Sequence, residues 1–225
     1  MIGLKKKLCL IYTINKFMEI IYNPFAKPFM EENPDVEIFN IMDDSLLPDT
    51  LSAGQLTNNV AARILNYVYA AEKAKADAVM ITCTSVNEAA AYARRFASIP
   101  VFNIDEPVAK MAVAAGGKIG VLATLPTSPL ATIRLLNKEA EAQGKKIETV
   151  SMVAEGAFDI LVAGDRKKHD EMVAEALHKL AGQVDVITFA QISMSLVPHE
   201  DPGKPVYKIG KSGFEEAKKI LFETK

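Results

Sequence analysis

Scarce residues already exclude several classes of protein. The 225 residues include no tryptophan, two cysteines and three histidines. Two cysteines without a metal-type spacing argue against a disulfide scaffold and against a zinc module, and they indicate a reduced cytoplasmic protein. The histidines are scattered without a metal-ligand spacing, so we expect no metal.

Neither an excess of one charge nor a long apolar run is present. The chain has 26 basic and 28 acidic residues, a formal net charge of −2, which leaves no basic surface of the kind that binds nucleic acid. No apolar run approaches the ~20 residues that cross a membrane. The apolar stretch Leu8–Tyr12 is too short for a secretory signal and lacks a cleavage pattern. We therefore predict a soluble cytoplasmic protein with no nucleic-acid or membrane partner.

Short apolar runs alternate with longer amphipathic stretches along the chain. This alternation is typical of an α/β fold in which helices cover a parallel sheet. Strands are predicted at residues 8–12, 36–41, 78–82, 101–102, 118–123, 147–152 and 186–189, and helices at residues 61–75, 85–97, 129–143 and 165–181.

Two parts of the sequence repeat each other. Asp77 begins an apolar run that leads to Cys83, and Asp185 begins a similar run that leads to Gln191. Each of these end residues follows its aspartate by six positions. The repeat therefore places a thiol in the first half where the second half has an amide.

Neighbouring strands agree with this repeat. Residues 7–13 match residues 118–124, and residues 35–39 match residues 146–150, both at a spacing of 111 positions. Matched strands in the same order predict two similar α/β halves related by a pseudo-twofold axis, with the active site in the cleft between them.

We place the boundary of the halves near residue 105. Residues 1–105 form the first half, which carries Cys83, and residues 106–210 form the second half, which carries Gln191. Residues 211–225 follow the second half and are expected to pack back on the first.

Polar side chains gather where four predicted strands end. Ligands of open parallel sheets bind beyond the carboxyl ends of the strands. Hydroxyls, amides and backbone N–H groups at such ends suit a carboxylate, so we expect a small-molecule carboxylate or carbonyl substrate. The candidate substrate-binding residues from these loops are Asn15, Thr84, Ser85, Thr124, Thr127 and Gln191.

Cys83 is the candidate catalytic residue. It ends a predicted strand just before a predicted helix, where unpaired N–H groups stabilise a thiolate that can abstract a proton or attack carbon. A small buried hydrophobe is the alternative interpretation, but the neighbouring hydroxyls favour a function. Cys9, which lies between two leucines, is predicted to belong to the core.

The remaining motifs are less specific. Thr127 fits helix capping as well as ligand binding. His199 lies in a loop after Gln191 and is the candidate second acid or base. The glycines at 116, 117 and 120 form no phosphate-binding loop, so no nucleotide cofactor is expected.

At these residues the chain resembles the aspartate/glutamate/hydantoin racemase superfamily. The resemblance implies cofactor-independent enzymes with two similar α/β halves, an active site between them and a homodimer. Residues 77–87 resemble the first catalytic-cysteine strand and turn, residues 100–108 the entry to the second half, residues 118–128 a carboxylate-binding loop, and residues 186–194 the second catalytic-cysteine strand.

One position departs from the family pattern. Two-base members use a cysteine on each side of a carbon acid; the first maps onto Cys83 and the second onto Gln191. An amide cannot take a proton, so Gln191 can hold a carboxylate or carbonyl but cannot act as a base.

We therefore predict a racemase-type isomerase in which Cys83 transfers a proton at the carbon α to a carboxylate or carbonyl. Three alternatives stay open. A lyase resembling arylmalonate decarboxylase needs a single cysteine, a covalent isomerase resembling maleate isomerase would use Cys83 as nucleophile, and a non-catalytic protein would only bind small carboxylates.

Overall fold

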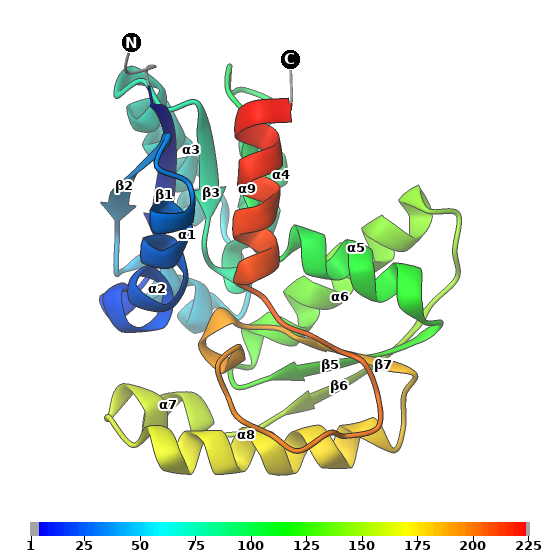
Figure 1. The fold of residues 1–225 in the computed structure, drawn as a ribbon. Helices are drawn as coiled ribbons and strands as arrows, with labels where there is room; N and C mark the ends of the chain where they lie inside the picture. Colours follow the sequence, from blue (N-terminus) through cyan, green and yellow to red (C-terminus); the bar gives the residue numbers. More distant parts are fainter. Residues whose placement is uncertain (1–4, 224–225) are drawn as a thin grey trace. The chain divides into compact units, whose positions relative to one another are not determined.

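The chain folds into two compact units that each hold a parallel sheet. The computed structural model describes residues 5–223. One unit comprises the described residues up to Asp105 together with those from Gly210 onward, and the other comprises Glu106–Ile209. Each unit has a four-stranded sheet with helices packed on it (Figure 1). The predicted α/β class with two similar halves is thereby confirmed.

The first unit has the strand order β2-β1-β3-β4. Its strands are β1 (Lys6–Tyr12), β2 (Val36–Met42), β3 (Ala78–Ile81) and β4 (Val101–Asn103). Its helices are the π-helix η1 (Met18–Ala26), α1 (Lys27–Glu32), α2 (Leu46–Ala53), α3 (Asn58–Lys73), the 3₁₀ turn η2 (Thr84–Val86), α4 (Glu88–Ala93) and α9 (Lys211–Glu223).

The second unit has the equivalent strand order β6-β5-β7-β8. Its strands are β5 (Lys118–Ala123), β6 (Glu148–Val153), β7 (Val186–Phe189) and β8 (Val206–Tyr207). Its helices are α5 (Glu106–Ala115), α6 (Thr127–Ala142), α7 (Ala157–Val162), α8 (Arg166–Ala181) and the 3₁₀ turn η3 (Ile192–Met194). In both units the first strand lies between the second and the third, so the sequence repeat is a structural one.

Alternating side chains decide which helices cover which face of the sheet in the second unit. Ile119 and Val121 of β5 pack with residues of α5 and α6, whereas Leu122 packs with residues of α7 and α8. Successive side chains of a strand point to opposite faces, so α5 and α6 cover one face and α7 and α8 the other. Gly120 leaves room for Leu180, whose carbons lie 3.0 Å from where a Cβ would stand.

The first unit is built in the same way. Cys9 and Ile11 of β1 pack with Val79 and Ile81 of β3 against residues of α3 and α4. Helix α9 contacts β1 and β3 and runs beside them in Figure 1. Cys9 is fully buried, as predicted, and burial raises the pKa of its thiol to about 12. It is therefore an unreactive core residue.

The two repeated aspartates have a structural task. The Asp77 carboxylate accepts a hydrogen bond from the N–H of Lys7 at 2.8 Å, and the Asp77 N–H donates to the Lys7 carbonyl at 2.7 Å. Asp185 makes the same two bonds to Lys118, at 2.9 and 2.8 Å. Each aspartate thus fixes the register of two neighbouring strands where the strands begin.

Several helices differ from the sequence prediction. The predicted helix at residues 85–97 is instead the turn η2 followed by the short helix α4. Helices η1, α1, α2, α5, α7 and α9 were not predicted, and the first four each contain a proline that weakens a helical pattern. In α1, α2 and α5 that proline lies in the first turn, where a missing N–H leaves no intrahelical bond unmade.

Two long helices of the second unit have well-defined ends. The Asp165 side chain accepts a hydrogen bond from the N–H of Lys168 at 3.0 Å and caps α8. Gly144 follows α6 with a φ of 66°, a conformation that glycine adopts without strain.

Candidate active site

Cys83 lies at the carboxyl end of β3, just before η2. Its backbone is still extended, with φ −135° and ψ 122°. Three donors point at its sulfur: the hydroxyl of Thr13 and the backbone N–H groups of Ser85 and Val86. The side chain is partly exposed. The fold therefore holds one accessible thiol at the edge of the sheet where ligands of parallel sheets bind.

Opposing influences set the protonation state of this thiol. Burial is the largest and raises the pKa of Cys83. The hydrogen bonds from Thr13, Ser85 and Val86 lower it, and the negative charge of Asp105 raises it again. Because the net pKa is raised, the resting group is a neutral thiol that can give a proton. The three donors are positioned to stabilise the thiolate that remains.

A buried network of amides and one carboxylate supports the Cys83 turn. The Asn103 amide donates to Asp105 at 2.6 Å and more weakly to the Cys83 carbonyl at 3.4 Å. The Asn87 amide donates to the other Asp105 oxygen at 3.0 Å. The sequence prediction missed Asn103 and Asp105; the available signal was a polar residue at the end of the apolar strand β4 and an acidic residue two positions later.

The loop after β1 places Thr13, and not Asn15, beside Cys83. Thr13 is 2% exposed and bonds Cys83, whereas Asn15 is exposed in a turn two residues further on. Thr84 and Ser85 are buried within η2, and Ser85 contributes its backbone N–H to the sulfur. The structure thus brings Thr13 and Ser85 to Cys83 and leaves Asn15 on the surface.

Gln191 occupies the position in the second unit that Cys83 occupies in the first. It follows β7 with an extended backbone, φ −144° and ψ 141°, and precedes the turn η3. Its side-chain oxygen accepts three hydrogen bonds, from the N–H of Thr124 at 2.6 Å, the hydroxyl of Thr124 at 3.2 Å and the N–H of Leu125 at 3.2 Å. The predicted binding residues Gln191 and Thr124 are therefore bonded to each other.

Further hydroxyls surround this amide in the sequence. Thr127 is the first residue of α6 and is buried. Ser193 and Ser195 follow Gln191, and within the described residues their buried Oγ atoms have no hydrogen-bond partner. Buried hydroxyls are almost always paired, so these two call for water or a ligand.

The histidines of the second unit lie in different surroundings. His199 is in the loop before β8, its Nδ1 is 2.8 Å from the Glu200 carbonyl oxygen, and its ring meets that of Phe189 edge-on at 6.2 Å. Because a carbonyl only accepts, Nδ1 carries the hydrogen. His169 of α8 is fully buried, with Nδ1 2.8 Å from Asp170.

Comparison with known proteins identifies the family. A family model described as Asp/Glu/Hydantoin racemase matches residues 26–219. The chain belongs to this family. Membership in the Asp/Glu/Hydantoin racemase family confirms the predicted resemblance and the predicted class of enzyme, an isomerase of the racemase type.

Solved racemases share the fold of this family member. A glutamate racemase from Bacillus anthracis is 15% identical with a TM-score of 0.71, over 98% of this chain and 83% of that one. An allantoin racemase from Klebsiella pneumoniae is 16% identical, with a TM-score of 0.69 over 96% and 88% of the two chains. An aspartate racemase from Picrophilus torridus is 15% identical, with a TM-score of 0.68 over 95% and 94%. No curated protein sequence matches the chain.

Asp43 follows β2 and is tied to α3 of the same unit. The carboxylate accepts hydrogen bonds from Ser45, Tyr67 and Arg63. Burial acts in the opposite direction, but these bonds prevail and hold the pKa of Asp43 at about 2. Asp43 is therefore an ionised structural group of this racemase-family fold at neutral pH.

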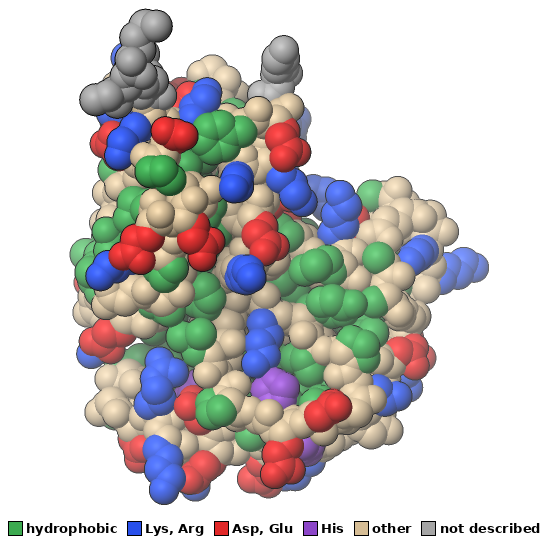
Figure 2. Space-filling view, viewed as in Figure 1, with side chains coloured by type: hydrophobic (Ala, Val, Ile, Leu, Met, Phe, Trp, Pro, Cys, Tyr) green, Lys and Arg blue, Asp and Glu red, His purple; other side chains and the backbone are tan. Residues whose placement is uncertain are grey.

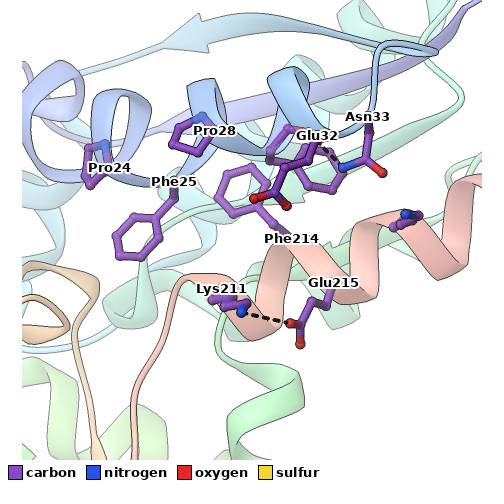
Figure 3. A pocket seen from close by; sticks show the side chains of 10 residues that line it. Pro24, Phe25, Pro28, Glu32, Asn33, Lys211, Phe214 and Glu215 are labelled. Carbon is purple, nitrogen blue, oxygen red and sulfur yellow. Dashed lines mark hydrogen bonds and ion pairs between the residues drawn. The ribbon is translucent and has the colours of Figure 1, made fainter.

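A separate cavity of the first unit contains none of the predicted site residues. It has a volume of about 520 Å³ and lies between η1, α1 and α9, where Phe25, Phe29 and Phe214 form its apolar wall (Figure 3). The rings of Phe29 and Phe214 lie 5.3 Å apart. At the rim, Lys211 pairs with Glu215 at 3.9 Å.

On the face in Figure 2, basic and acidic side chains are interspersed, without a continuous area of one sign. Among residues 5–223, no three His, Cys, Asp or Glu side chains gather as metal ligands. No helix in this described range is both long and apolar enough to span a membrane.

Proposed function

We propose that the protein is a cofactor-independent isomerase that transfers a proton at the carbon α to a carboxylate or carbonyl group, with Cys83 as the proton-transfer residue. The observation that carries the proposal is the placement of a partly exposed thiol among three donors at a strand end of a racemase-family fold.

The proposed step follows from the surroundings of Cys83. In the forward direction the S–H bond breaks, a C–H bond forms at the substrate carbanion, and a thiolate remains. Thr13 and the N–H groups of Ser85 and Val86 stabilise that thiolate. In reverse, the thiolate takes the α-proton, and hydrogen-bond donors stabilise the enolate oxygen as charge develops.

Gln191 takes the place of a second base. Its amide holds an oxygen of the substrate and takes no proton. Cys83 alone removes and returns a proton on one face of the carbon, which gives exchange with retention of configuration. For full racemisation the candidate second base is His199: with its Nδ1 hydrogen directed at Glu200, the neutral ring has its lone pair on Nε2.

A lyase is the second candidate, and the protonation state of Cys83 favours it. A decarboxylase needs one proton donor after carbon dioxide leaves, and a thiol whose pKa is raised is protonated at neutral pH. The carbon–carboxylate bond breaks, its electron pair stays on the α-carbon, and the Cys83 proton neutralises it. No second base is required.

Proton exchange in deuterium oxide tests the proposal. The solved relatives are racemases of glutamate, aspartate and allantoin, so these compounds come first, followed by 2-hydroxy acids and substituted malonates. Exchange of the α-proton seen by NMR, and lost in Cys83→Ala, is the expected result. Carbon dioxide release from a malonate identifies the lyase. Undiminished exchange in Cys83→Ala contradicts both.

Cys9→Ala provides the matched control, because Cys9 is the other thiol and is buried in the core of the same unit. It should retain exchange. Mass spectrometry separates the remaining alternatives: a substrate adduct on Cys83 indicates covalent isomerisation, and binding without exchange or adduct indicates a binding protein. Light scattering tests the homodimer, and cell fractionation tests the cytoplasmic location.

A further inference from the structure

The side-chain oxygen of Gln191 fills a complete hydrogen-bonding cradle. We use this name for the N–H and hydroxyl of Thr124 and the N–H of Leu125, which converge on that oxygen at 2.6, 3.2 and 3.2 Å. Backbone N–H groups can only donate, so the atom they meet must be the amide oxygen and not Nε2. The orientation of the whole amide is thereby fixed.

Convergent donors of this kind are suited to an anion. Two backbone N–H groups and a hydroxyl aimed at one point stabilise a carboxylate oxygen or an oxyanion. In this chain the cradle is occupied by a neutral oxygen of the protein itself, on a side chain only 8% exposed. A tethered group is present at high effective concentration, so a free carboxylate competes poorly for the same donors.

The nitrogen of the Gln191 amide, Nε2, differs from the oxygen in its hydrogen bonding. Within the described residues the hydrogen bonds of the Gln191 amide all involve its oxygen, and Nε2 makes none. The two N–H hydrogens of Nε2 are therefore left for a ligand. The buried Oγ atoms of Ser193 and Ser195 also have no partner among the described residues, which adds neutral groups next to it in sequence.

We propose that Gln191 is a specificity-determining residue: by occupying the cradle with its carbonyl and presenting Nε2, it selects substrates that offer a neutral carbonyl, amide or imide oxygen to this unit instead of a carboxylate. Its role in turnover rests on the proposed function above. The occupied cradle itself does not, because it is a property of the second unit without any reaction.

One cation of the second unit bears on this selection. Lys208 lies 5.4 Å from the ring centre of Phe189 and donates to the Val197 carbonyl at 3.3 Å. Burial lowers the pKa of this ammonium group. The N–H signals of Thr124 and Leu125 report on the cradle directly, because these two amides are its donors.

Substitutions of Gln191 open the cradle or keep it filled. Gln191→Ala removes the amide and leaves the donors open. Gln191→Glu keeps the length and places a charged oxygen on the same donors, so it is the matched control for a filled cradle. Should Gln191→Ala fail to fold, Gln191→Ser opens the cradle with a small polar side chain. Unchanged amide spectra of residues distant from Gln191 establish that a variant is folded.

The test is a titration with sodium acetate, followed by the ¹⁵N–¹H signals of Thr124 and Leu125 at constant ionic strength. We expect saturable shifts of both signals in Gln191→Ala and at least tenfold weaker binding in the wild type and in Gln191→Glu. Equal acetate binding by wild type and Gln191→Ala overturns the proposal. The proposal is also overturned when a folded Gln191→Ala or Gln191→Ser variant shows no acetate-dependent shift of the Thr124 and Leu125 signals.

Turnover supplies the second measurement. Wherever wild-type exchange is found, a hydantoin or half-amide should be at least tenfold better in kcat/KM than the matching dicarboxylate, and Gln191→Ala should narrow that ratio. A ratio unchanged by the substitution overturns the specificity role. The acetate titration can give the expected shifts while no substrate shows proton exchange. In that case the proposed function is wrong and the occupation of the cradle by Gln191 is still supported.

Discussion

The two units have equivalent backbone conformations at Cys83 and Gln191 but different side-chain chemistry at these two positions. Cys83 and Gln191 both follow the third strand of their unit in extended conformation and both precede a 3₁₀ turn. Each is bonded by the threonine that directly follows the first strand, Thr13 in one unit and Thr124 in the other. These threonines are themselves 111 positions apart, the spacing of the sequence repeat.

Side-chain length explains why Cys83 and Gln191, at equivalent backbone positions, accept hydrogen bonds from backbone N–H groups of different loops. The short Cys83 side chain stays near its own turn and accepts from Ser85 and Val86. The longer Gln191 side chain reaches the loop after β5 and accepts from Thr124 and Leu125. The fold repeats the donors and the strand ends, and the residue at this position decides whether those donors meet a thiol or an amide.

Removing the sulfur should have the largest effect. Cys83→Ser keeps the size and hydrogen bonds of the side chain but replaces the thiol by a hydroxyl of far higher pKa. We expect proton exchange to fall by about 10²- to 10⁴-fold, the usual contribution of a general acid or base, as measured by NMR in deuterium oxide. A loss of less than threefold would mean that another group moves the proton.

Giving both units a cysteine at the end of the third strand should change the stereochemical course of proton exchange. Gln191→Cys places a thiol directly before η3, in which Ser193 and Met194 occupy the positions that Ser85 and Val86 occupy in η2. A single enantiomer should then lose its optical activity faster than with the wild type, as followed by polarimetry. Exchange that stays strictly retentive in a folded Gln191→Cys variant would show that the second turn does not activate a thiol.

Thr13→Val tests the hydrogen bond that the first unit gives its cysteine. The bond lowers the pKa of Cys83, so its loss should raise that pKa and shift the pH profile of iodoacetamide alkylation upward. At neutral pH the rate should fall about fivefold, as for a bond of about 1 kcal/mol. Thr124→Val is the control: it removes the equivalent hydroxyl of the other unit and should leave Cys83 alkylation unchanged.

The residues that follow β2 and β6 differ in charge, and this difference should have a smaller effect, on stability in acid. The Asp43 N–H donates to the Tyr12 carbonyl as the Ala154 N–H donates to that of Ala123, yet only Asp43 carries a charge, with a pKa of about 2. A folded pKa below the unfolded one stabilises the fold above pH ~4, and this stability is lost as the pH falls toward 2.

The contribution of Asp43 should be about 1–2 kcal/mol after allowance for solvent screening. Urea unfolding of wild type and Asp43→Asn, followed by circular dichroism at pH 7 and near pH 2.5, measures it. The difference in unfolding free energy between the two proteins should shrink in acid. A difference that is equal at both pH values would assign the stability of this cluster to something other than the charge of Asp43.

Local patterns made the sheets and the family predictable, because buried strands such as β5 and β7 are short apolar runs with clear ends. Cys83 was recognisable because hydroxyls surround it in the sequence. The aspartates Asp77 and Asp185 were visible as repeated positions, but their bonds to Lys7 and Lys118 join residues far apart in the chain, and no local pattern reveals such a bond.

The missed parts of the site have the same origin. Asn103 and Asp105 reach the Cys83 turn only after β4 is paired with β3. Asn15 looked as suitable as Thr13, because a sequence does not tell which residue of a loop turns inward. The bonding of Gln191 to Thr124 depends on the adjacency of β5 and β7, so the amide could be predicted as a binder but not as the occupant of the cradle.

The path of the chain through the first unit has a consequence for synthesis. The first unit is made from two separated stretches, and the whole of the second unit is encoded between them. During translation the second unit is therefore synthesised in full before α9, the helix that packs against β1 and β3. The unit that is started first is the one completed last, so β1 and β3 stay without this helix until translation has passed the second unit.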